Sequence, residues 1–206
     1  MSIELDHIFW MVPKSAVTGV TERFEAIGLR ESYRRAHPGQ GTANVCYCFE
    51  NAFLEVLWLE DESEARSPSI ARTLLADRGI GQANPFGMCW RGKADLAMWD
   101  FRPTYLPDGV SIPMATLSDD PCLPLLFTFP GAKPPRDLPP KRHGGMQAEA
   151  GWSSLELISM QCGAPDDLRP VADQMAKPFI VTGGEPSCTV RFSGEADAYD
   201  LKLPLG

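Results

Sequence analysis

The period of the apolar residues changes twice within the first sixty positions, and this change restricts the fold more than any other feature of the chain. Residues 3–12 are rich in β-branched and aromatic side chains and end at Pro13, which predicts a strand. Residues 15–27 then carry apolar side chains at helical spacing, and Gly28 is the expected end of the helix. Three more strands are predicted, at residues 29–35, 44–49 and 53–60. The order is therefore strand, helix and three strands (βαβββ), which indicates an α+β fold.

The same order of elements recurs near the C-terminal end. A strand at residues 155–160 and a helix at 166–176 precede three short strands, at 179–181, 189–192 and 201–205. Repetition of one order predicts two weakly similar units within the chain.

The segment between these units has fewer regular elements. A helix is predicted at residues 68–77 and a strand at 85–91, whereas residues 99–140 are rich in Pro and Gly. We expect most of that stretch to be irregular, apart from a strand at 125–129. We therefore divide the chain into three parts. Residues 1–64 are a first βαβββ module, and residues 141–206 are a C-terminal βαβββ-like module. Residues 65–140 contain a helix, strands and a Pro/Gly-rich insert, or alternatively form a middle module.

Charge and cysteine usage narrow the range of partners. The chain has a formal net charge of −8 and a pI near 4.9. Nucleic-acid surfaces need clustered Lys and Arg, so this balance argues against a nucleic-acid partner and against an anionic membrane surface. The apolar stretches are strand-sized, and the N-terminal residues lack the pattern of a signal peptide. Six cysteines without a CxxC pair favour reduced thiols and a cytoplasmic location.

Several short motifs resemble one known family. They are Leu-Asp-His-Ile at 5–8, His-Pro-Gly-Gln-Gly-Thr-Ala-Asn at 37–44, Leu-Glu-Val at 54–56, the stretch 99–107, and Leu-Pro at 123–124. In combination they resemble glyoxalase-like proteins of the vicinal oxygen chelate superfamily. The resemblance implies repeated βαβββ modules whose sheets curl around a shared cavity.

The resemblance also implies a divalent metal site. In metal-dependent members of the superfamily a divalent ion chelates two neighbouring oxygens of the substrate, and an imidazole with a carboxylate suits Zn, Fe, Ni, Mn or Co. A His on the first strand and a Glu on the fourth supply the first-module ligands, and these positions match His7 and Glu55.

Strand alternation, considered independently, is compatible with a partnership between these two residues. It places His7 on one face of its strand with Leu5 and Phe9, and Glu55 on the same face as Phe53. Both strands are apolar on both faces, and a carboxylate buried there is costly unless a cation or several donors compensate it. We predict that the polar atoms of His7 and Glu55 lie within roughly 5 Å of each other, bridged by an ion or water or directly hydrogen-bonded.

The remaining ligands depend on which segment is the second module. If the C-terminal unit is, Glu156 aligns with His7. If the middle segment is the second module, its strands offer Met88, Cys89 and residues 127–129, which include no carboxylate or imidazole.

Other residues are candidates for ligand binding. Asn44 stands at a strand start, where it could bind its own loop or a ligand. Trp99, Arg102 and Tyr105 lie in a Pro-bounded segment and could line the mouth of the cavity, with Arg102 on a carboxylate. The alternative is a loop fixed to the core by its aromatic rings. His37 is interpreted as a turn-stabilising or solvated residue.

Two functions remain open. The first is a metal-assisted enzyme (a lyase, isomerase or dioxygenase) acting on a small molecule, in which the ion polarises an oxygen and a carboxylate moves the proton. The second is a metal-free protein that sequesters a small molecule without catalysis, as bleomycin-resistance members of the superfamily do. Both predict a small-molecule ligand, and either a monomer or a homodimer.

Overall fold

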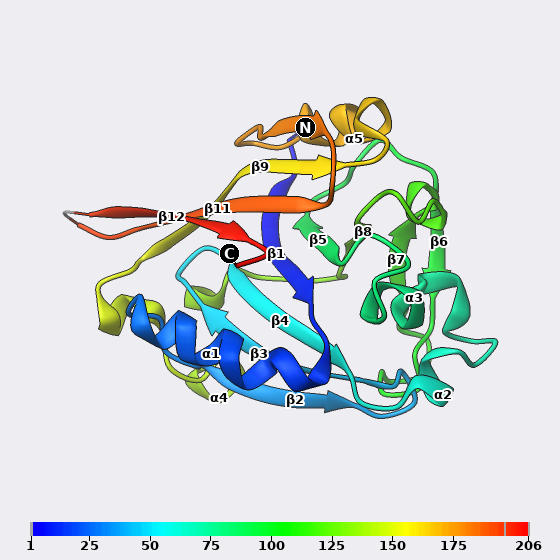
Figure 1. Ribbon diagram of the computed structural model, residues 1–206, viewed down its shortest axis with the longest axis horizontal. Helices are drawn as coiled ribbons and strands as arrows, with labels where there is room; N and C mark the ends of the chain where they lie inside the picture. The colour runs from blue at the N-terminus through cyan, green and yellow to red at the C-terminus, as the bar shows by residue number, and fades with distance from the viewer. Residues whose placement is uncertain (1, 196, 206) are drawn as a thin grey trace.

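Two β-sheets form the framework of the described chain, residues 2–195 and 197–205 of this computed structural model (Figure 1). The larger sheet has eight strands in the order β2-β3-β4-β1-β5-β8-β7-β6. Its first half comprises β1 (Glu4–Met11), β2 (Tyr33–His37), β3 (Thr42–Cys48) and β4 (Phe53–Leu59). Its second half comprises β5 (Phe86–Arg91), β6 (Met98–Phe101), β7 (Ile112–Ala115) and β8 (Leu125–Thr128).

The two halves of the large sheet repeat one pairing pattern. β1 pairs with β4 in parallel, β5 pairs with β8 in parallel, and β1 and β5 run antiparallel at the centre. In the first half α1 (Val17–Ala26) connects β1 to β2, and the chain turns at Gly28 with a φ of 86°. The βαβββ order predicted for the N-terminal unit and the α+β class are confirmed.

The middle of the chain is more regular than the sequence predicts. β6 and β7 lie within the stretch expected to be irregular, and Pro113 is inside β7. Each has only four residues, and pairing with neighbouring strands defines them more than local preference does. The helix predicted at 68–77 is instead a 3-10 turn (Ala71–Thr73) followed by the short helix α3 (Leu75–Gly79), and a separate short helix, α2 (Glu62–Ala65), precedes them. The break falls at Leu74, whose φ of 57° is left-handed.

Arg78 fastens α3 to the second half of the large sheet. Its side chain is 1% exposed and donates hydrogen bonds to the backbone carbonyls of Asn84, Leu123, Ser118 and Thr73. Burial lowers the pKa of its guanidinium to about 10. The charge therefore serves to hold the loops before β5 and β8.

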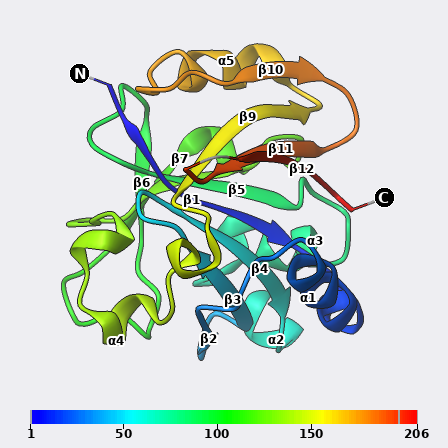
Figure 2. The same cartoon turned by 90° about the vertical axis from the view of Figure 1, so that its left-hand side faces the viewer.

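The C-terminal unit forms a separate four-stranded sheet. Its elements are β9 (Ser154–Cys162), α5 (Pro165–Ala172), β10 (Ile180–Gly183), β11 (Ser187–Ser193) and β12 (Ala198–Leu203). The strand order is β10-β9-β11-β12, so β9 has its parallel partner in β10, whereas β1 has its parallel partner in the last strand of its unit. Figure 2 shows this sheet and α5 as a layer on one side of the eight-stranded sheet. The module boundaries 1–64, 65–140 and 141–206 stay predictions.

Alternation along β1 divides the core into two clusters. Ile8 and Trp10 belong to the larger cluster, which joins the large sheet to α1 and to the C-terminal sheet. Phe9 and Met11 point to the opposite face and belong to a smaller cluster with residues of α3 and β6–β8. A cavity lies on this second face. Among the described residues, no helix has the length and apolar character to cross a membrane.

Candidate functional site

A cavity of about 620 Å³ lies on the face of the large sheet that carries the smaller core cluster. Every strand of that sheet except β5 contributes to its wall. Its apolar lining includes Phe9, Phe53, Leu57, Phe101, Ile112 and Phe127. Its size and composition are typical of a small-molecule site.

A bulge in β1 determines which side chains enter this cavity. Leu5 pairs with Trp90 and His7 pairs with Cys89. Trp90 and Cys89 are adjacent in β5, so Asp6 is an extra residue in β1 without a partner of its own. Asp6 and His7 consequently both line the cavity, while Leu5 packs against the larger cluster on the other face. The prediction that Leu5 shares a face with His7 is wrong because simple alternation ignores the bulge.

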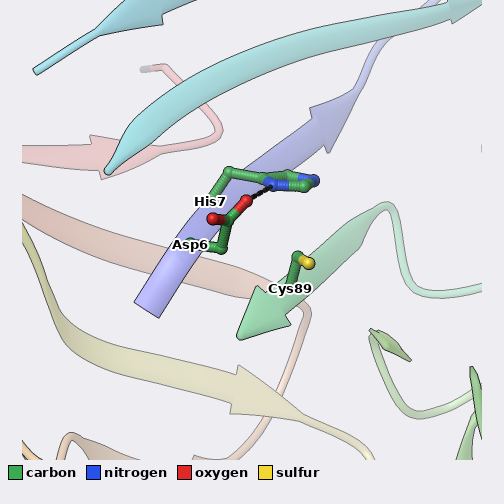
Figure 3. A group of neighbouring side chains, drawn as sticks. All are labelled: Asp6, His7 and Cys89. Atoms are coloured by element: carbon green, nitrogen blue, oxygen red, sulfur yellow. Dashed lines mark hydrogen bonds and ion pairs between the residues drawn. The ribbon is translucent and has the colours of Figure 1, made fainter. Parts of the chain in front are cut away.

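Asp6 fixes the orientation of the His7 ring. The Nδ1 atom of His7 lies 2.9 Å from Oδ2 of Asp6. Figure 3 shows the imidazole ring and the carboxylate directed towards each other. Arg91 donates from Nη1 to Oδ1 of Asp6 at 2.8 Å, and its Nη2 donates to the carbonyls of Leu5 and Asn51. Burial alone would raise the pKa of Asp6, but the hydrogen bond from His7 and the charge of Arg91 lower it. Asp6 therefore stays an ionised acceptor for Nδ1.

The other ring nitrogen of His7 faces Glu55. Nε2 lies 3.7 Å from Oε2 of Glu55, within the separation that the sequence predicts. The second carboxylate oxygen of Glu55 accepts a hydrogen bond from Nδ2 of Asn44 at 2.5 Å, and Oδ1 of Asn44 accepts one from the backbone N–H of Arg35. His7 is 8% exposed and Glu55 7%. The sequence-predicted residues His7, Glu55 and Asn44 are thus brought together.

Two aromatic rings contact His7. The ring of Phe53 stacks on His7 with centroids 4.2 Å apart, and Phe127 meets it edge-on at 5.3 Å. With Nδ1 engaged by Asp6, Nε2 and the Glu55 carboxylate face each other as two proton acceptors in a partly dry site. Such an arrangement holds a proton or binds a cationic or hydrogen-donating group between them.

A second polar group also lines the cavity. The hydroxyl of Tyr105 donates to Oε1 of Gln40, and Nε2 of Gln40 donates to Oγ1 of Thr42. Nδ1 of His37 lies 3.0 Å from the same Thr42 oxygen, and its ring lies against Tyr105. His37 therefore lines the cavity rather than standing in solvent, and burial lowers its pKa despite the opposing charge of Glu55.

The other candidate residues are located elsewhere. Trp99 packs beneath the guanidinium of Arg72, 4.4 Å from the ring centroid, and Arg102 is exposed and pairs with Asp100. Glu156 lies on β9 and pairs with Lys177. The cavity wall includes Tyr105 but none of these three candidates, so they have no part in the site proposed below.

Sequence reasoning missed three kinds of site residue. Asp6 depends on the bulge, and Gln40 on a turn whose geometry the sequence does not specify. Arg35 could have been found, because period-two alternation along β2 places it on the same face as His37.

A family model for a glyoxalase-like domain matches residues 5–107. The chain therefore belongs to the glyoxalase-like domain family, within the vicinal oxygen chelate superfamily.

One solved structure agrees at the level of the fold. A hypothetical protein from Staphylococcus aureus has a TM-score of 0.52 at 11% identity, over 97% of this chain and 85% of that one. A Streptomyces coelicolor methylmalonyl-CoA epimerase variant in complex with 2-nitronate-propionyl-CoA has a TM-score of 0.40 at 15% identity, over 65% of this chain and 99% of that one. No curated protein matches the chain in sequence.

Proposed function

We propose that this protein catalyses proton transfer on a small carbonyl compound bound in the cavity, an isomerase or lyase type of reaction. The observation that carries the proposal is the 3.7 Å approach of His7 Nε2 to Glu55 Oε2, with Nδ1 held by Asp6. Proton transfer by a positioned side chain needs this kind of fixed, water-poor geometry.

Glu55 is the proposed base. Asn44 holds one of its oxygens, which leaves Oε2 directed towards His7 and the cavity. When a C–H bond next to the carbonyl breaks, the proton passes to Oε2 and the electron pair moves onto the carbonyl oxygen. The proton held between the two groups resides on Nε2 of His7, which then donates a hydrogen bond to that oxygen, while Asp6 maintains the ring orientation through Nδ1. Return of the proton to carbon gives isomerisation, and loss of a neighbouring group gives elimination.

The donor set does not fit a resident divalent ion. A catalytic ion ordinarily has three protein ligands, and in the described chain the one cluster of three potential ligands is Asp6, His7 and Cys89. Both Asp6 oxygens are already engaged, by Arg91 and by His7. Cys89 is fully buried, and burial raises the pKa of its thiol. Ligation would require displacing the Arg91 cation and ionising that thiol, so no step is assigned to a metal.

Proton exchange tests the proposal directly. A panel of small keto acids and ketones is incubated with the protein in D₂O, and loss of the proton next to the carbonyl is followed by NMR. We expect exchange in the wild type and a drop of about 10²–10⁴-fold in Glu55→Gln, because the base is removed while its shape is retained. Glu60→Gln is the matched control, since Glu60 is exposed and pairs with Lys14.

Two other results would redirect the proposal. If chelation by EDTA abolished exchange and a divalent ion restored it, the metal-assisted alternative would hold instead. If compounds raised the melting temperature but none underwent exchange, the protein would be a metal-free binder of the resistance type.

A further inference from the structure

We infer that the ligand of this cavity is an amphipathic anion, with an apolar body against the aromatic wall and an acid group at the mouth. The inference rests on the proposed function, because it identifies the substrate class of the same site. Three cationic residues carry it: Arg35 on β2, Lys133 in the loop after β8, and Arg142 in α4 (Pro140–His143).

These three cations line the cavity without acidic partners. Within the described part of the chain, none of them forms an ion pair with a carboxylate. Arg35 is held by neutral groups: its guanidinium lies 4.5 Å from the ring centroid of Tyr33, and its Nη2 is 3.4 Å from the carbonyl of Arg142. The charge is therefore positioned but not neutralised.

The neighbouring residue provides an internal comparison. Arg34 makes a two-oxygen contact with Glu31, outside the cavity. Alternation along β2 directs Arg35 to the opposite face. The charge of Arg34 is therefore paired with Glu31, whereas the charge of Arg35 faces the cavity. In a chain with a net charge of −8, three uncompensated cations that line one cavity attract anions locally.

The depth of the cavity sets the orientation of the ligand. The buried Glu55 carboxylate would repel an acid group placed beside it, whereas Phe9, Phe53 and Phe127 offer apolar surface. An acid group is therefore favoured at the mouth, where Arg142 can contact it, with the reacting carbon nearer Glu55. A flat or short-chain carboxylic acid bearing a carbonyl meets both conditions.

A pair of matched probes tests the charge requirement. 4-Phenylbutanoate and 4-phenylbutan-1-ol share an apolar body and differ in the acid group, and their dissociation constants are measured by calorimetry at low and high salt. We expect the acid to bind about tenfold more tightly than the alcohol at low salt, because charge-assisted contacts favour it, and the difference to shrink at high salt.

Variants assign that preference to the mouth. Arg35→Gln combined with Arg142→Gln should remove the preference for the acid and leave the affinity for the alcohol unchanged. Lys202→Gln, at an exposed position of β12 and outside the cavity, is the matched control and should change neither. Thermal melts verify that each variant is folded.

The inference is overturned if wild-type protein binds the two probes equally, binds neither, or loses affinity for both in the double variant. Its failure is distinguishable from failure of the proposed function, because these readouts measure binding and do not depend on proton exchange. A preserved acid preference without exchange would contradict only the proposed reaction.

Discussion

The two halves of the eight-stranded sheet share their strand pairing but differ in chemistry. The β1–β4 half contributes Asp6, His7, Asn44 and Glu55 to the cavity. The β5–β8 half contributes apolar side chains from β6, β7 and β8, and none from β5. Repetition of a backbone pattern therefore does not repeat a site, because the site depends on a few side chains grafted onto it.

Gly87 on β5 shows how the apolar half accommodates its counterpart. A Cβ atom at this position would lie 2.0 Å from Cε1 of Phe9, which means that the ring from β1 occupies the space over β5. Cys89, two residues on, is small and fully buried. The small residues of β5 on this face thus leave space, and the Phe9 ring of β1 occupies it.

Arg78→Met should have the largest effect, and it tests whether the buried charge beside the second half of the sheet stabilises the fold. Loss of the guanidinium leaves four backbone carbonyls without their donor, and we expect unfolding to become easier by about 3–5 kcal/mol. Chemical denaturation measures the change. Arg72→Met is the control, because Arg72 is exposed, and its midpoint should hardly move. A near-neutral Arg78 variant would mean that water or neighbouring groups satisfy these carbonyls.

Phe127→His sharpens the comparison by adding a polar donor to the apolar half. Its ring already meets His7 edge-on, so an imidazole there would give His7 and Glu55 a third potential ligand. We expect Zn²⁺ affinity to rise at least about tenfold over wild type in equilibrium dialysis. Phe101→His, on the outermost strand β6, is the matched control within the same cavity. Tight Zn²⁺ binding by the wild type would contradict the incomplete donor set.

The same contrast explains what the sequence could predict. In the first half, strong periodicity predicted the order of elements. The family resemblance, with which strand alternation is compatible, predicted that His7 and Glu55 share one cavity. Alternation could not reveal Asp6, because a bulge is decided by pairing with β5, a strand about eighty residues away. In the middle segment the four-residue strands β6 and β7 carry little local signal, so the side-chain directions of Trp99 and Arg102 were not predictable.

The smallest expected effect concerns pH and the polar wall of the first half. His37 is held beside Thr42 and Tyr105, and burial lowers its pKa below the ordinary value of 6.5, with Arg35 adding to the shift and Glu55 opposing it. Below about pH 6.5 the unfolded chain therefore binds a proton at this residue more readily than the folded chain does. Its contribution to stability is complete above that pH and is lost as the pH falls through the folded-state pKa.

His37→Gln isolates this contribution, because an amide can still hydrogen-bond to Thr42 but does not titrate. Melting temperatures of both proteins are measured from pH 8 to pH 5, and the wild type should lose stability more steeply below about pH 6.5. Each pH unit between the folded and unfolded pKa corresponds to about 1.4 kcal/mol. Asp6 does not interfere, because its lowered pKa places its own loss of stability below pH 3.8. Parallel curves for the two proteins would mean that His37 takes up its proton in the folded state without a cost in stability. Water would then have access to the His37 ring, contrary to what its burial indicates.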